Sequence, residues 1–140
     1  MTQYNFTYPI EVRYGDLDPQ GHLNNASYLT FFEQARVQYF IHLGFFKKNT
    51  SFLDIGVIIA DVHLTFHSPV QFGDEILVSV KTTRIGNKSM TVRQSLIDKK
   101  TDKEVCTGEV VLVAYDYHVG KTIPIPAEWR EILTSFENLS

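Results

Sequence analysis

Residues Tyr14–Phe32 read YGDLDPQGHLNNASYLTFF and connect a stretch of alternating residues to an amphipathic one. A connection from a strand to a helix needs only a turn and one capping side chain. This joint contains many more polar groups, placed beside two glycines and a proline; they are Asp16, Asp18, His22, Asn24 and Asn25. Their number raises the question of a function beyond the turn.

A long amphipathic helix is predicted after the joint, over about residues 25–43. Apolar side chains recur there at spacings of three and four and form a wide stripe. These residues are Tyr28, Leu29, Phe32, Ala35, Tyr39, Phe40 and Leu43. Asn24 or Asn25 is a suitable N-cap, and Gly44 stands where a left-handed C-terminal cap is favoured.

Alternation of apolar and polar residues predicts one strand before the helix and four after it. The predicted strands cover residues 7–14, 56–70, 74–86, 88–100 and 104–116. The segments FGDE (72–75), IGNK (85–88) and DKKTDKE (98–104) are interpreted as hairpin turns. The tail 126–139 opens with Pro126 and predicts a short final helix.

This order of elements predicts an α+β fold in which an antiparallel sheet of about five strands wraps around one long central helix. The 140 residues favour a single domain over 1–140. One helix covers only one face of such a sheet, and exposed edges invite association. A homo-oligomer is therefore expected.

Composition excludes several classes of protein. The net charge of −3, with acids and bases mixed along the chain, argues against a nucleic-acid binder. Cys106 is the single cysteine, so neither an internal disulfide nor a cysteine-rich metal site is expected. With neither a membrane-length apolar run nor a signal-peptide pattern, a cytoplasmic protein without a membrane partner is predicted.

The polar joint suits a reaction at a carbonyl group. Amides at a helix N-terminus have no intrahelical partners and lie at the positive end of the helix dipole, where they stabilise a developing oxyanion. A carboxylate just outside that turn can attack a carbonyl or deprotonate a water. Asp18 is suited to this position because Pro19 disfavours an α conformation at the preceding residue. Asp16 is the alternative, and either aspartate could instead only cap the turn.

The block RYGDLDPQGHLNNASYLTFFEQAR, residues 13–36, resembles the hotdog-fold acyl-CoA thioesterases, and most closely their 4-hydroxybenzoyl-CoA thioesterase and YbgC-like branch. The resemblance covers nearly the whole chain. It implies a homodimer or homotetramer with active sites between subunits, and hydrolysis of an acyl-CoA or acyl-carrier-protein thioester without a metal or cofactor. On this resemblance the catalytic aspartate is Asp18, and the amide that polarises the thioester carbonyl lies near Asn25.

The GHLNN segment departs from the benzoyl-CoA type and resembles plant acyl-carrier-protein thioesterases. On that match Gln20 and His22 occupy the family's asparagine and histidine places, which makes His22 a candidate for catalysis or for hydrogen bonding at the helix start. A protein that only binds acyl-CoA remains an alternative, although binding alone does not require Asp18.

Other polar residues are weaker candidates for the functional site. Arg84 and Lys88, with Arg93, are candidates for contact with the CoA phosphates, although solvated turn charges are the favoured interpretation because basic residues at turns are ordinary. Glu33 and Arg36 stand three apart on the helix and could pair with each other. A structural role is favoured for Glu33; the alternative is catalysis, because another branch of the hotdog proteins, which this chain resembles, uses a helix glutamate. No third ligand accompanies His63 and His67, so no metal site is predicted.

Overall fold

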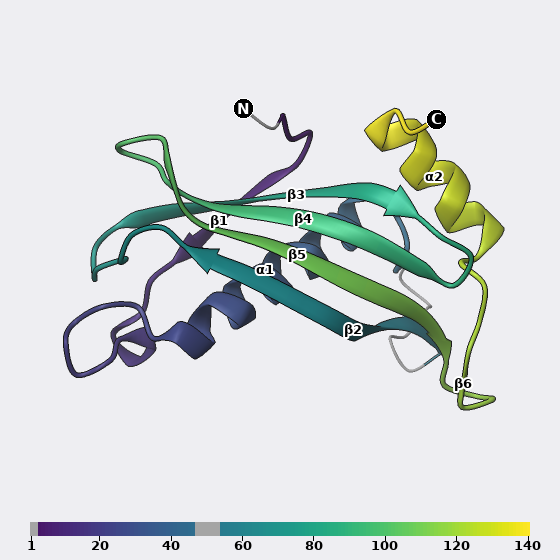
Figure 1. Cartoon of the computed structure of the whole chain (residues 1–140), viewed down its shortest axis with the longest axis horizontal. Coiled ribbons are helices and arrows are strands. Elements are labelled where there is room, and N and C mark those ends of the chain that lie inside the picture. The colour runs from purple at the N-terminus through teal and green to yellow at the C-terminus, as the bar shows by residue number, and fades with distance from the viewer. Residues whose placement is uncertain (1–2, 47–53) are drawn as a thin grey trace.

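The computed structural model describes residues 3–46 and 54–140, which form a curved sheet with one helix lying across its face and a second helix at its end (Figure 1). The elements in chain order are β1 (Thr7–Glu11), the 3₁₀ helix η1 (Tyr14–Asp16), α1 (Asn25–His42), β2 (Ile55–Phe66), β3 (Glu75–Ile85), β4 (Ser89–Asp98), β5 (Lys103–Asp116), β6 (Lys121–Thr122) and α2 (Ala127–Glu137).

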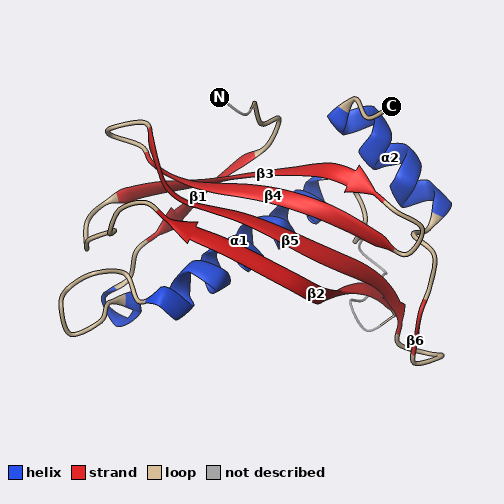
Figure 2. Cartoon of the chain, in the orientation of Figure 1, coloured by secondary structure: helices blue, strands red, loops and turns tan. Residues whose placement is uncertain are grey.

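The sheet is antiparallel throughout and its strands lie in the order β1-β3-β4-β5-β2, with the two-residue β6 paired to the end of β5. Helix α1 lies along one face of this sheet (Figure 2). The predicted hotdog architecture, a sheet of about five strands around one long helix, is therefore confirmed. β6 was not predicted because two residues carry no alternation signal.

Both ends of α1 are capped by the residue types that the sequence indicates. The Asn24 side chain accepts a hydrogen bond from the Ala26 amide at 2.9 Å, which satisfies one free donor of the first turn. Gly44 has a φ of +82° and its amide donates to Ile41 O at 3.0 Å. Glycine adopts this left-handed conformation without steric cost, so the helix ends there.

The apolar stripe of α1 packs directly on the sheet. Phe32, Ala35 and Tyr39 are completely buried. Gly108 of β5 lies against this stripe, since a methyl group there would lie 3.3 Å from Phe32 Cε2 of α1 and 2.7 Å from Leu64 Cδ2 of β2. A glycine at this position therefore sets how closely the helix approaches β5 and β2.

The C-terminal helix α2 is anchored by a buried carboxylate. Glu137 Oε2 accepts hydrogen bonds from the Tyr39 hydroxyl at 2.6 Å and from the Thr82 amide at 2.8 Å. Hydrogen bonds to a buried carboxylate compensate for its loss of hydration. This network joins α2 to both α1 and β3.

Two local predictions were wrong. The first strand ends at Glu11, because Tyr14–Asp16 forms η1, in which the Tyr14 side chain is 82% exposed. The FGDE segment is not a hairpin turn, since β2 and β3 are not neighbours in the sheet. The IGNK and DKKTDKE segments do join adjacent strands, β3 to β4 and β4 to β5.

We predict that Gly108→Ala destabilises the protein by about 1–3 kcal/mol, the usual cost of overpacking a core, because the added methyl group would overlap Leu64. Urea unfolding followed by circular dichroism measures the change. Gly15→Ala is the matched control, because no atom lies within 4 Å of the corresponding methyl position. Equal midpoints for Gly108→Ala and the wild type would contradict the close approach of helix and sheet.

Candidate active site

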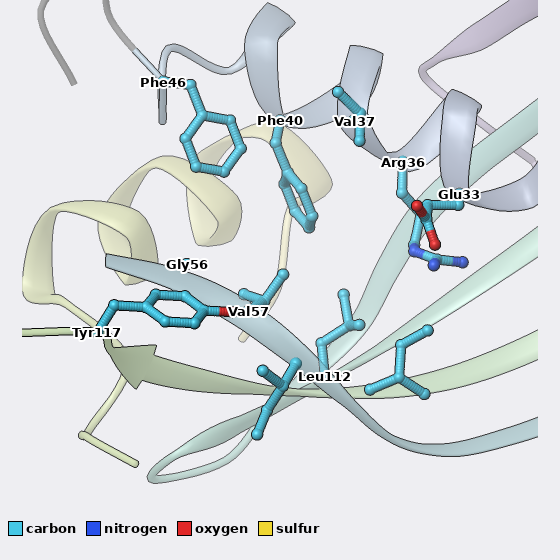
Figure 3. A pocket seen from close by; sticks show the side chains of 11 residues that line it. Glu33, Arg36, Val37, Phe40, Phe46, Gly56, Val57, Leu112 and Tyr117 are labelled. Carbon is cyan, nitrogen blue, oxygen red and sulfur yellow. The ribbon is translucent and has the colours of Figure 1, made fainter. Parts of the chain in front are cut away.

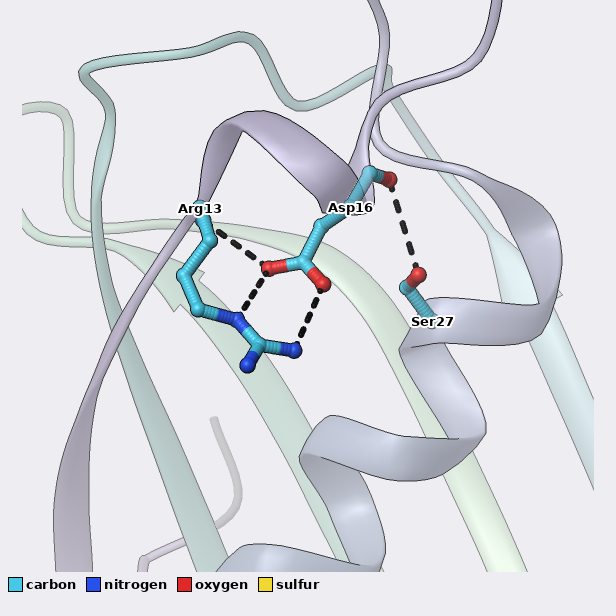
Figure 4. Close-up of polar contacts among 3 residues, drawn as sticks. All are labelled: Arg13, Asp16 and Ser27. Atoms are coloured by element: carbon cyan, nitrogen blue, oxygen red, sulfur yellow. Dashed lines mark hydrogen bonds and ion pairs between the residues drawn. The ribbon is translucent and has the colours of Figure 1, made fainter.

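Asp16 fixes the joint between β1 and α1 (Figure 4). It is only 6% exposed, and its carboxylate accepts hydrogen bonds from the Arg13 amide at 2.9 Å and from the Arg13 guanidinium at 3.1 and 3.3 Å. Its main-chain oxygen accepts from the Asn24 amide at 2.8 Å, and the Ser27 hydroxyl lies 3.5 Å from the same oxygen. Both oxygens of the Asp16 carboxylate are thus occupied, which gives this residue a structural role.

The Asp18 carboxylate is held differently, by one oxygen. Its Oδ1 accepts hydrogen bonds from the Gln20 amide at 2.9 Å and from the His22 amide at 3.1 Å. The main chain closes the same loop, because the Asp18 amide donates to His22 O at 2.8 Å. In the part of the chain that the structure describes, Oδ2 has no hydrogen-bond partner. Asp18 is half-buried. Its carboxylate is therefore held in place through Oδ1, while Oδ2 is free to react with a bound group.

The amides at the start of α1 are nearly all satisfied. The amide of Leu23 donates to Val70 O at 2.7 Å, and that of Ser27 donates to Asn24 O at 2.9 Å. The amides of His22, Asn24 and Ala26 donate to the acceptors named above. Over 22–27, the Asn25 amide alone has no acceptor among the described residues. It lies at the first helical position, where the dipole of α1 favours negative charge.

One cavity of about 430 Å³ brings these groups together. Asp18, His22 and Asn25, the three predicted site residues of the joint, all line it. Gln20, Leu23, Tyr28, Phe66, His67, Ser68 and Pro69 complete its wall. Of these, Tyr28, Phe66, His67 and Ser68 were not identified as site residues from the sequence.

Tyr28 and Phe66 form the apolar side of the cavity. Tyr28 is 3% exposed, and its ring packs edge-to-face on Phe66 with centroids 4.9 Å apart. Burial raises the pKa of the Tyr28 hydroxyl, and the nearby Asp18 charge adds to this shift. The hydroxyl therefore stays protonated at neutral pH. The site combines an apolar wall with a few placed polar groups, as ligand sites usually do.

The structure does not bring Arg84 and Lys88 to this cavity within one chain. Both are exposed and lie at the far end of β3, in its last residues and in the turn that follows. The joint meets the other end, where His22 forms an isolated bridge with Gln71 just before β3 begins. The eleven residues of β3 span ~36 Å at the usual strand rise. Their contact with CoA phosphates remains a prediction.

The Cys106 thiol near Tyr28 is not a second nucleophile at this site. Burial raises the pKa of the Cys106 thiol to about 12, so it is neutral at physiological pH and not a thiolate nucleophile. His67, which lines the cavity, has its Nε2 atom 3.0 Å from the Thr107 hydroxyl.

No cluster of three or more metal-ligating side chains occurs in residues 3–46 and 54–140. No described helix is long and apolar enough to cross a membrane.

Glu33 and Arg36 do not form the simple pair that their spacing suggests. Arg36 is buried, and its Nη1 donates to Gln94 Oε1 at 2.9 Å. Gln94 Nε2 in turn donates to Phe32 O at 2.8 Å. Glu33 acts on Arg36 only through its charge, which opposes the lowering of the Arg36 pKa by burial.

The sheet and helix have the hotdog arrangement, and the Asp18 carboxylate lies beside the N-terminus of α1. The family model described as the thioesterase-like superfamily matches residues 12–133, and the chain belongs to this family. This confirms the family that the joint resembles.

Known relatives and structures agree with this assignment. The chain is 28% identical over 133 residues to the uncharacterized protein YsmA of Bacillus subtilis, covering 94% of this chain and 87% of YsmA. It is 25% identical to the long-chain acyl-CoA thioesterase FadM of Escherichia coli, covering 89% of this chain and 93% of FadM. A thioesterase from Thermus thermophilus, solved with coenzyme A and Zn, aligns with a TM-score of 0.82 at 28% identity, over 99% of this chain and 98% of that one.

We predict that Asp16→Asn lowers the melting temperature at pH 7 and that this difference shrinks in acid. Hydrogen bonding from Arg13 lowers the pKa of the Asp16 carboxyl in the folded protein. The interaction therefore contributes stability above the unfolded-state pKa of about 4, and this contribution disappears as the pH falls through the folded-state value. Thermal melts of both proteins between pH 7 and pH 2 measure it. A difference that stays constant with pH would show that the Asp16 charge is not involved.

Proposed function

We propose that this protein hydrolyses the thioester of an acyl-CoA to the free acid and CoA, with Asp18 as the catalytic carboxylate. One observation carries this proposal: Asp18, whose Oδ2 has no partner, and Asn25, whose amide has no acceptor among the described residues, line a single cavity. The name of FadM, a long-chain acyl-CoA thioesterase, and the coenzyme A in the Thermus structure support CoA as the carrier.

In the proposed mechanism the thioester carbonyl oxygen accepts a hydrogen bond from the Asn25 amide. The positive end of the α1 dipole stabilises the negative charge that develops on this oxygen in the transition state. Asp18 Oδ2 either attacks the carbonyl carbon or takes a proton from an attacking water. Two backbone amides fix the other oxygen, so the carboxylate loses little entropy in reaching the reactive orientation.

His22 has a positioning role in this proposal. Its amide binds Asp18, and its half-buried ring lines the same cavity. The ring makes no hydrogen bond to a described residue, which leaves it available to the leaving thiolate or to the carrier. Because GHLNN resembles the plant enzymes, acyl-carrier protein is the alternative carrier. Hydrolysis of one acyl group on CoA and on acyl-carrier protein distinguishes the two.

We further propose that the working protein is a homodimer, or a pair of such dimers, joined through β2. This strand ends the sheet and pairs only with β5 among the described strands. Over its twelve residues it exposes Ile58, Ile59 and Phe66, an unusual apolar content for a solvent-facing edge. A second copy that adds its own β2 antiparallel to this edge satisfies the outer backbone groups and buries these side chains.

We predict that Asp18→Asn lowers kcat for acyl-CoA hydrolysis at least ~100-fold, the usual scale of general acid–base catalysis, while acyl-CoA binding changes little. Asparagine keeps Oδ1 as an acceptor for the Gln20 and His22 amides but cannot attack a carbonyl or hold a proton. Release of the CoA thiol, measured with a thiol-reactive dye, gives the rate.

Asp98→Asn is the matched control for this prediction. Asp98 Oδ1 also accepts a hydrogen bond from the amide two residues on, Lys100, in a hairpin outside the cavity. This variant should keep the wild-type rate. An Asp18→Asn enzyme of near-normal kcat would reject Asp18 as the catalytic carboxylate. Wild-type protein that binds acyl-CoA stoichiometrically without releasing thiol would instead identify a binding protein.

We predict that light scattering gives a mass of at least twice the 16.1 kDa of one chain, and that Ile58→Lys shifts it towards the monomer. A lysine at this edge opposes strand pairing by its charge and hydration. Val119→Lys is the control, because Val119 is exposed in the turn before β6 and should not affect assembly. A monomeric wild-type protein at micromolar concentration would exclude the dimer.

A further inference from the structure

A second cavity of about 370 Å³ lies between α1 and β2, and it differs in character from the candidate active site (Figure 3). Most of its wall is apolar and comes from Val37, Phe40, Phe46, Val57, Leu112 and Tyr117. Glu33 and Arg36 lie together at one end of it, away from Phe46 and Tyr117 (Figure 3). A cavity of about 150 Å³ already holds a benzene molecule, so this one accepts a substantial part of an acyl group.

Arg36 is the unusual member of this wall. It is only 5% exposed, yet no carboxylate of a described residue lies within ion-pair distance of its guanidinium. Its one hydrogen bond to a described residue, from Nη1 to Gln94, uses one of five donors. Gln94 is itself fixed by Phe32 O, so the guanidinium has a defined orientation. The remaining guanidinium nitrogens have no hydrogen-bond partner among the described residues, and they are not among the fully buried unpaired atoms. Since Arg36 lines the cavity, these donors are open to it and can bind a ligand.

Glu33 determines which ligand these donors suit. Its exposed carboxylate lies beside the guanidinium at the same end of the cavity (Figure 3), and the two opposite charges interact. A carboxylate on the ligand would meet repulsion from Glu33. A hydroxyl group, in contrast, accepts from Arg36 and donates to Glu33 at the same time.

We propose that this cavity binds the distal part of the acyl group, and that Arg36 and Glu33 select acyl groups with a hydroxyl at the end remote from the thioester. This inference rests on the proposed thioesterase function and adds the substrate class. Arg36 follows Asn25 by eleven residues, about three helical turns, so both lie on the same side of α1. Their separation along the axis is ~16 Å, which a medium-length acyl chain spans.

The test compares acyl-CoAs in matched pairs: octanoyl, decanoyl and dodecanoyl chains, each with and without a terminal hydroxyl. We expect kcat/KM to favour the hydroxylated member by at least ~10-fold at the length that reaches the cavity, because a site built for a hydroxyl discriminates against its absence. Arg36→Met should remove this preference, so that kcat/KM becomes equal for the two members of each pair.

A second variant keeps the test decisive if Arg36→Met does not fold. Glu33→Gln removes the repulsion of anions at an exposed position, so hydrolysis of the matching terminal-carboxyl acyl-CoA should increase at least ~5-fold. Glu131→Gln, an exposed glutamate on α2, is the control and should change neither substrate.

The outcomes separate the two proposals. Wild-type hydrolysis at equal kcat/KM for both members of every pair would overturn this inference and leave the thioesterase function intact. A preference that persists unchanged in Glu33→Gln, without gain on the terminal-carboxyl substrate, would also overturn it. Absence of hydrolysis of any acyl-CoA would overturn the proposed function and this inference together.

Discussion

The hydrogen bonds of Asp16 hold the start of α1 against the end of β1, and the geometry of the site depends on them. The carboxylate binds Arg13 on the strand side, and the main-chain oxygen binds Asn24 at the helix cap. Between these fixed ends the chain makes a tight turn in which the Gln20 and His22 amides donate to Asp18 Oδ1. One aspartate thus builds the joint, while the other lines the cavity and keeps one oxygen without a partner among the described residues.

Helix α1 links three features that stand apart in the sequence. Its first turn presents a free amide, its apolar stripe forms the core, and its middle carries a buried arginine. Gly108 lets the sheet approach this helix closely, and both cavities described above are lined by residues of α1 and β2. A helix that is rigid over its whole length can therefore position catalytic and ligand-binding groups relative to one another.

The sequence predicts the features that depend on local patterns and on the motif of the joint. The bounds of α1 and α2, the strands and two hairpins follow from periodicity and capping, and Asp18, His22 and Asn25 do share a cavity. The FGDE segment was misread because turn composition does not show which strands become neighbours. Tyr28 was assigned to the core because it fits the apolar stripe of the helix. Phe66 lies far from the joint in the sequence, and only the folding of β2 brings its ring onto Tyr28. Arg84 was proposed as a CoA contact from the basic residues of the turn that follows it; within one chain the length of β3 separates it from the cavity, and the contact itself stays a prediction.

The measurement that tests the central claim most directly is a crystal structure with an acyl-CoA analogue in which a methylene ketone replaces the thioester. The proposed mechanism requires the ketone oxygen at about 3 Å from the Asn25 amide nitrogen, with Asp18 Oδ2 facing the carbonyl carbon. An analogue that binds with its carbonyl group outside this cavity, or with the Asn25 amide bonded to another group of the protein, would contradict it.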